Sequence, residues 1–202
     1  MLKIFIPSYN RPDTTSTPAM LDACGASYKV VVRPSQAAAY AKHIAKSKLL
    51  VMPTEGGLNV AREFIRQQLR RDEWCVQMDD NLRGFLQAEK KFYKAHDEVP
   101  LSKNEKMITR VRWQAKLSVD VSWPKFYDQV VEDSLQEAEH RRAWLVGFSM
   151  HENPAFRARK FSDVGYASGK IRLMRRQNAL PWNQSRESAC EDYALAAAHM
   201  YE

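Results

Sequence analysis

Four short apolar segments alternate with three helical patterns over the first 80 residues, and this alternation constrains the fold more than any other feature of the sequence. The predicted strands cover residues 3–6, 28–32, 48–52 and 74–78, and the predicted helices cover residues 15–24, 35–46 and 58–70. Ser35 is expected to cap the second helix, and Gly25 to end the first. Because parallel neighbours need a crossover, usually a helix, the pattern predicts an α/β fold with a mostly parallel sheet flanked by helices.

A different pattern follows Asn81. Charged residues crowd the segment 87–105, which predicts a loop or a short helix. Three further elements are predicted: a strand within residues 107–121, an amphipathic helix over 125–142 and a buried strand over 144–150. With 202 residues in the chain, we expect a single domain whose two halves cover residues 1–86 and 87–202.

The composition is that of a globular protein, with 45% hydrophobic and 27% charged residues. No apolar run approaches the roughly 18 residues that would span a bilayer, and no signal peptide precedes the first strand. The three cysteines, Cys24, Cys75 and Cys190, are far apart, which argues against a disulfide framework and a zinc site. We therefore expect a soluble, cytoplasmic protein with reduced thiols and no membrane partner.

The net charge of +7 is concentrated in one segment. Residues 157–186 hold eight basic residues and one acid, so the rest of the chain is neutral. Aromatic side chains interleave with these charges, which favours contact with a polyanion such as nucleic acid. The candidate acceptor-binding residues are Arg172, Arg175, Arg176 and Trp182. The alternative interpretation is a solvated surface hairpin.

Two adjacent carboxylates end the apolar segment 74–78. In open α/β sheets ligands bind at the carboxyl ends of the strands, and adjacent carboxylates repel each other unless a cation lies between them. Asp79 and Asp80 therefore predict a magnesium or manganese site shared with a diphosphate. Asp80 is the preferred direct ligand, because it lies nearer the turn. The alternative is an acidic turn that binds no ligand.

Other candidate ligand contacts also follow strands or begin helices. In the loop that starts at Pro7, Tyr9 is placed to stack on a base and Arg11 to meet phosphate, unless the loop is an ordinary turn. Asn59 and Arg62 fall at the start of the helix 58–70, and the glycines before it do not form a GxGxxG fingerprint.

An acidic pair, Glu191 and Asp192, begins a final predicted helix that Ser188 would cap. Acids at a helix N-terminus stabilise the helix dipole, so this pair can be purely structural. A carboxylate oriented there can also act as a general base.

Taken together, four short segments resemble the GT-A glycosyltransferases in the same chain order. They are residues 6–11, similar to the first nucleotide-binding loop; 57–62, similar to a helix start near the nucleotide; 77–81, similar to the DxD metal motif; and 191–192, similar to the acidic pair that supplies the base. The resemblance implies a Rossmann-like GT-A sheet. The small size, the Ser-Tyr-Asn-Arg-Pro opening and the basic charge look most like the TET-associated glycosyltransferases, phage-type proteins thought to glycosylate 5-hydroxymethylpyrimidines in DNA.

The resemblance implies a metal-dependent transfer of a hexose, with UDP-glucose as the expected donor, to modified DNA such as 5-hydroxymethylcytosine. It assigns the base to Asp192 with Glu191 as its partner, and the ion, Mn²⁺ or Mg²⁺, to Asp80 and Asp79. The implied donor-binding residues are Pro7, Tyr9, Arg11, Asn59, Arg62 and Asp79. Double-stranded DNA is the expected partner, in the host cytoplasm if the protein is phage-encoded.

Two features depart from the family pattern. The third position of the metal motif is the amide Asn81, so the two aspartates must share the ion, and His199 lies closer to the acidic pair than the family's metal-binding histidine. Two alternative functions stay open. One is transfer to a glycan or cell-envelope acceptor, and the other is a catalytically idle nucleic-acid-binding module.

Overall fold

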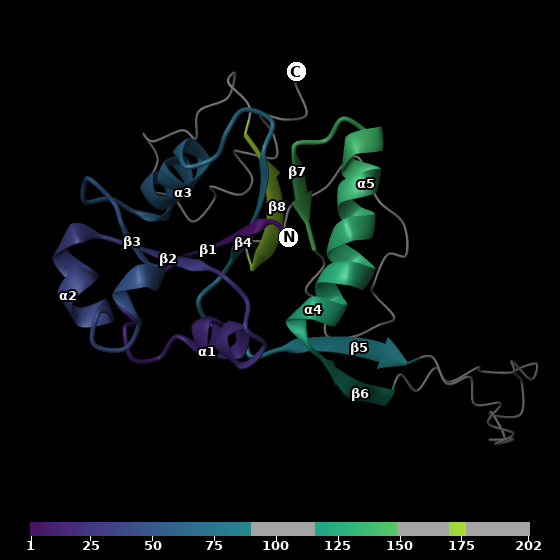
Figure 1. The fold of residues 1–202 in the computed structure, drawn as a ribbon, viewed down its shortest axis with the longest axis horizontal. Coiled ribbons are helices and arrows are strands. Elements are labelled where there is room, and N and C mark those ends of the chain that lie inside the picture. The colour runs from purple at the N-terminus through teal and green to yellow at the C-terminus, as the bar shows by residue number, and fades with distance from the viewer. Residues whose placement is uncertain (90–115, 149–169, 177–202) are drawn as a thin grey trace, which may run out of the picture.

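The computed structural model describes residues 1–89, 116–148 and 170–176 (Figure 1). The first half contains β1 (Lys3–Pro7), α1 (Ser16–Ala23), β2 (Lys29–Val32), α2 (Ala37–Tyr40), β3 (Leu49–Val51), α3 (Leu58–Gln67), β4 (Trp74–Met78) and β5 (Phe85–Glu89). Short 3₁₀ turns cover Pro34–Gln36 and Lys46–Lys48. The second half contains β6 (Lys116–Val121), α4 (Trp123–Phe126), a π-helical turn (Tyr127–Val131), α5 (Glu132–His140), β7 (Leu145–Gly147) and β8 (Ile171–Arg175).

The central sheet has the strand order β3-β2-β1-β4-β8-β7. The pairs β1–β2, β2–β3 and β1–β4 are parallel, whereas β8 runs antiparallel to both β4 and β7. The predicted α/β class is confirmed, but the sheet is mixed rather than mostly parallel. The difference arises because β8, which the sequence interpretation treated as part of a charged surface, inserts as a strand between β4 and β7.

The order of the strands reverses at β1. Strands β2 and β3 are added on one side of β1, and β4 is added on the other. In open α/β sheets such a switch point leaves a crevice at the carboxyl ends of the strands, where ligands bind. This topology places the loop at Ser8 beside the turn at Asp80.

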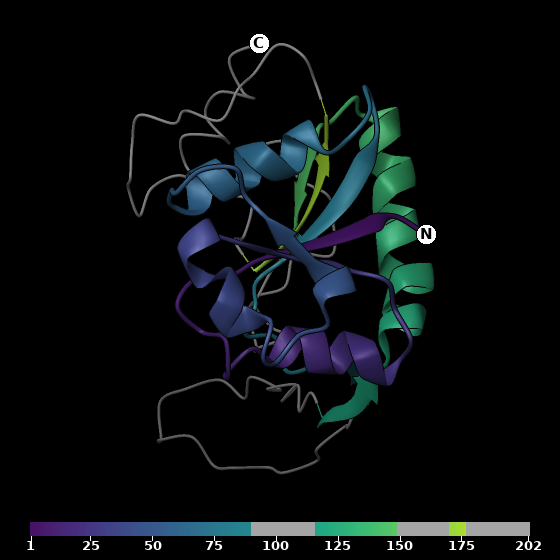
Figure 2. The same cartoon turned by 60° about the vertical axis from the view of Figure 1, so that its left-hand side comes forward.

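Helices cover both faces of the sheet (Figure 2). On one face, Ala61 and Ile65 of α3, together with Leu69 just after its end, pack against Phe5, Val31, Cys75 and Met174. On the other face, α1, α2 and the helix 123–140 pack against Ile4, Ile6, Val30, Val32, Val76, Met78 and Leu173. Burial on both faces explains why the parallel strands are almost continuously hydrophobic.

The long helix ties the second half of the chain to the first. It spans residues 123–140, close to the predicted 125–142. The indole N–H of Trp74 donates to Glu139 at 3.0 Å, and the hydroxyl of Tyr127 accepts from the N–H of Leu2 at 3.0 Å.

Helix α1 and the region of α2 show one confirmed expectation and one correction. Gly25 follows α1 with a φ of 68°, and its N–H donates to Asp22 at 3.0 Å, as expected for a helix end. The predicted helix 35–46 shortens to α2, and Ser35 does not cap it. Ser35 lies instead within the 3₁₀ turn Pro34–Gln36, and its N–H and Oγ donate to Glu55, after β3, at 2.8 and 3.0 Å.

Strands β5 and β6 form a separate antiparallel hairpin that extends from beneath α4 (Figure 1). Strand β5 takes the place of the loop or short helix expected from residue 87, and β6 confirms the weak strand signal that ends at residue 121. Phe85 anchors the hairpin, with its ring centroid 4.3 Å from that of Phe126 and 5.7 Å from that of Trp123.

Candidate functional site

The loops at the carboxyl ends of the four parallel strands are linked by polar contacts. Between the first two loops, the N–H of Asn10 donates to Gln36 at 3.2 Å, and the Gln36 amide donates back to the Asn10 side chain. The loop after β2 continues the chain of contacts to the loop after β3 through Ser35 and Glu55. A ligand at this edge would therefore meet one connected surface.

Asp80 lies at the centre of this edge, in the turn after β4. Its side chain is buried, with a residue exposure of 6%. One carboxylate oxygen, Oδ2, accepts a hydrogen bond from Ser8 Oγ at 2.5 Å, and the other, Oδ1, accepts from Arg11 Nη1 at 3.1 Å. The Arg11 side chain is 54% exposed, so a cationic group that faces solvent covers one oxygen of a buried acid.

Thr17, in the first turn of α1, fixes the turn that carries Asp80. Its Oγ1 donates to the carbonyl of Asp79 at 2.6 Å and accepts from the N–H of Leu82 at 2.8 Å. Its own N–H donates to the carbonyl of Asp80 at 3.1 Å. Three hydrogen bonds from one buried residue define the backbone path of the acidic turn.

Tyr40, at the end of α2, completes the surroundings of Asp80. Its hydroxyl lies 2.6 Å from Ser8 Oγ and accepts from the N–H of Arg11 at 3.1 Å. Ser8, Arg11, Tyr40 and Asp80 thus form a closed ring of hydrogen bonds, which we call the Asp80 ring. Tyr40, with a residue exposure of 0%, is its most buried member.

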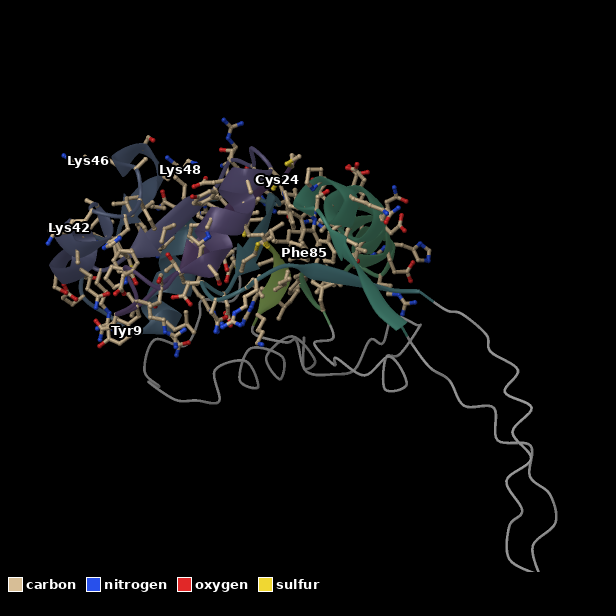
Figure 3. The ribbon with its side chains drawn as sticks, turned by 90° about the horizontal axis from the view of Figure 1, so that it is seen from below. Tyr9, Cys24, Lys42, Lys46, Lys48 and Phe85 are labelled. Atoms are coloured by element: carbon tan, nitrogen blue, oxygen red, sulfur yellow. The ribbon has the colours of Figure 1, made fainter. Side chains whose placement is uncertain are left out.

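Tyr9 offers an exposed aromatic surface at the same edge. Its residue is 51% exposed, and the guanidinium carbon of Arg33 lies 3.8 Å from the centroid of its ring (Figure 3). Arg33 directly follows β2, as Tyr9 follows β1. The stacked pair can bind a planar group such as a nucleobase through cation–π and stacking contacts.

The carboxylates suit a shared ion better than a closed protein cage. In the described ranges 1–89, 116–148 and 170–176, no group of three His, Cys, Asp or Glu side chains could hold a metal. Magnesium, however, is often bound by one or two carboxylates together with substrate phosphates and water. The guanidinium of Arg11 places positive charge against Oδ1 of Asp80. Asp80 and the half-buried Asp79 carry oxygen ligands of the kind that Mg²⁺ or Mn²⁺ takes.

Two of the predicted donor-binding residues are buried residues of α3. Asn59 and Arg62 are 8% and 2% exposed, in the first turns of that helix. Gln77 and Arg172 face each other across β4 and β8, and Gln77 contacts Met174 of the core beneath α3. Paired residues share a sheet face, so both point toward α3. These side chains form a buried polar layer, whereas Tyr9 and Arg11 are exposed and Pro7 ends the buried strand β1.

The predicted acceptor-binding arginines do not form one surface beside Asp80. Arg172 is 1% exposed. Arg175 pairs with Trp74 at the start of β4, about 13 Å along the strand from its carboxyl end. Its Nε lies 3.4 Å from Asp72, and the guanidinium of Arg176 donates to the carbonyl of Leu69. They are spread out because a strand sends alternate side chains to opposite faces and carries them away from the edge.

Within the described part of the charged segment, residues 170–176, Lys170 lies beside the acidic turn. Lys170 is exposed, and its carbonyl accepts from the N–H of Asp79 at 2.8 Å. Glu191, Asp192, Trp182 and His199 lie outside the described residues.

Sequence reasoning did not single out Ser8, Thr17, Arg33, Tyr40 or Lys170 as site residues. Two of them carried a usable signal, because Arg33 directly follows a predicted strand and Lys170 lies in the basic segment 157–186. Ser8, Thr17 and Tyr40 are recognised only by contacts that span up to 72 residues of sequence.

Comparison with known proteins identifies the family. Searches among curated proteins and among solved structures returned no match. Among the described residues, no helix is both long enough and apolar enough to cross a membrane. The family model described as TET-Associated Glycosyltransferase matches residues 2–121, more than half of the chain, and the match includes the whole Asp80 ring. The chain belongs to the TET-associated glycosyltransferase family.

Proposed function

We propose that this protein transfers a hexose from a nucleotide-diphosphate sugar, UDP-glucose in the first instance, to the hydroxymethyl group of a modified pyrimidine in DNA. The observation that carries the proposal is the Asp80–Arg11 pair at the β1–β4 switch point, inside the segment that matches the family. An acid and an exposed cation at such an edge suit a diphosphate and its counter-ion.

The donor would lie across the loops after β1, β2 and β4. Stacking of the base on Tyr9 beside Arg33 would leave the diphosphate near Arg11 and Asp80. Arg11 can form two parallel hydrogen bonds to a phosphate. A Mg²⁺ or Mn²⁺ ion held by Asp80 and Asp79 would neutralise negative charge on the diphosphate.

In the proposed reaction the acceptor hydroxyl oxygen forms a bond to the anomeric carbon of the hexose. The bond between that carbon and the diphosphate oxygen breaks, and UDP leaves with the bonding electrons. The hydroxyl proton passes to a carboxylate, for which Asp192, with Glu191 beside it, is the candidate that the family resemblance supplies.

Lys170, rather than Arg172, Arg175 and Arg176, would contact the acceptor. Lys170 is exposed beside Asp79, so it can contact a DNA phosphate while the modified base reaches the donor. A hydroxymethyl group on pyrimidine carbon 5 projects into the major groove, as the thymine methyl does, and is accessible in duplex DNA. We place the reaction in the cytoplasm, the host's if the protein is phage-encoded, where the expected donor and DNA are both present.

The test incubates the protein with UDP-glucose and a duplex that contains 5-hydroxymethylcytosine, with Mn²⁺ or with EDTA. Mass spectrometry should show one added hexose per modified base with Mn²⁺, and none on unmodified DNA. Lys170→Glu should reduce transfer to DNA while donor hydrolysis continues. The matched control is Lys46→Glu, an exposed lysine in the turn before β3, away from Tyr9 (Figure 3).

Two results would overturn the proposal. If no sugar is transferred to hydroxymethylated DNA from any of a panel of nucleotide sugars, DNA is not the acceptor. If Lys170→Glu and Lys46→Glu behave alike, the acceptor does not pass over the β8 side of the crevice.

A further inference from the structure

Tyr40 is buried behind the candidate site, yet its hydroxyl joins two of the site's functional groups. The tyrosine belongs to α2, 32 residues from Ser8 and 29 from Arg11 along the chain. The residue is fully buried, so its hydroxyl cannot touch a ligand directly. Its position suggests a role that acts through its neighbours.

The hydrogen-bond directions in the Asp80 ring follow from counting protons. An ionised carboxylate only accepts, so the single hydroxyl proton of Ser8 goes to Asp80. Ser8 Oγ must then accept from Tyr40, whose oxygen in turn accepts from the N–H of Arg11. The bonds therefore run in one direction, from the backbone of Arg11 through Tyr40 and Ser8 to Asp80.

The same ring also controls the side chain of Arg11. The backbone N–H of Arg11 is held by Tyr40, while its guanidinium reaches Oδ1 of Asp80. Loss of the Tyr40 hydroxyl would free the Ser8 hydroxyl to rotate and would release the backbone of Arg11. Both the acid and the cation of the candidate donor site would lose their fixed orientation.

We propose that Tyr40 is a positioning residue that holds Asp80 and Arg11 ready for the diphosphate and its ion. The inference rests on the proposed function, because it assumes that these two residues bind the donor. Groups that orient a metal ligand from behind typically change metal affinity by about 10- to 100-fold when removed. Tyr40 acts through Ser8, so we expect an effect at the lower end of this range.

The experiment compares Tyr40→Phe with Tyr127→Phe, using UDP and Mn²⁺ as probes in titration calorimetry. Tyr127 is also a buried tyrosine whose hydroxyl accepts from a backbone N–H, but it belongs to the helix 123–140 and bonds to Leu2, before β1. Tyr40→Phe should weaken Mn²⁺-dependent UDP binding about tenfold, and Tyr127→Phe should leave it unchanged. In a Ser8→Ala background, Tyr40→Phe should cost less affinity than in the wild type, because the link to Asp80 is already broken and only the contact with the N–H of Arg11 is left to lose.

Equal affinity for Tyr40→Phe and the wild type would overturn the inference, as would additive effects of Tyr40→Phe and Ser8→Ala. If Tyr40→Phe fails to fold, Ser8→Ala alone must show the tenfold loss. If the wild type binds no UDP with Mn²⁺, the proposed donor is wrong. The hydrogen-bond path from Tyr40 through Ser8 to Asp80 is then tested by chemical denaturation. Tyr40→Phe should lower the free energy of unfolding less in an Asp80→Asn background than in the wild type. Equal losses in the two backgrounds would refute the path.

Discussion

Replacement of Asp80 by Asn separates the role of its charge from the role of its shape. The substitution keeps the size of the side chain, and the amide oxygen can still accept from Ser8. The contribution of that hydrogen bond to stability falls from about 1.5–3 kcal/mol, for a bond to a charged group, to about 0.5–1.5 kcal/mol for a neutral one. The amide N–H₂ would then face the guanidinium of Arg11, where both groups are donors.

The effect on stability should be small. The ion pair with Arg11 is half-exposed on the arginine side, so it contributes at most about 1 kcal/mol. Loss of the charge also relieves repulsion with Asp79, which offsets part of the cost. We expect a net destabilisation of about 1–2 kcal/mol, or about 2–8 °C in Tm for a chain of this size.

The effect of Asp80→Asn on the affinity for UDP should be large. Calorimetry with UDP, in Mn²⁺ and again in EDTA, should show that Asp80→Asn abolishes the metal-dependent part of the affinity while circular dichroism shows an intact fold. Asp72→Asn is the matched control, because Asp72 is an exposed acid at the amino end of β4. If UDP binding is unchanged by both EDTA and Asp80→Asn, the ion site at the carboxyl edge is wrong.

Further predictions concern the catalytic base, the hydrogen bonds of Thr17 to the acidic turn, and the thiols. Asp192→Asn should lower turnover on the order of a hundredfold or more with little change in UDP affinity, measured by steady-state kinetics, and near-wild-type turnover would transfer the role to another group. Thr17→Val should lower the free energy of unfolding by about 1–3 kcal/mol in chemical denaturation, because the N–H of Leu82 and the carbonyl of Asp79 lose their partner. An unchanged midpoint would show that Thr17 does not hold the acidic turn. Burial raises the pKa of the Cys75 thiol, so at pH 8 iodoacetamide should modify half-buried Cys24 first, and peptide mapping that finds Cys75 alkylated in the folded protein would contradict the described core.

The sequence alone determined the elements that depend on local pattern. Strand β4 begins at Trp74 and ends at Met78, the predicted limits, because an apolar segment stops where carboxylates prefer a turn. The parallel β1–β4 core follows from strand–helix alternation, which leaves few alternative topologies. This is also why the acidic turn and the exposed Tyr9 could be assigned to the ligand edge in advance.

Only the tertiary structure decided which residues meet. Strand β8 was missed because Arg172 and Arg175 made a buried strand resemble a charged surface, and neither charge nor alternation reveals which strand lies alongside. The Asp80 ring joins residues that are 29–72 positions apart, through side chains that any polar surface could carry. Local propensities act over a few residues, whereas these contacts depend on the path of the whole chain. The place of Tyr40 behind Asp80 therefore follows only from the assembled sheet.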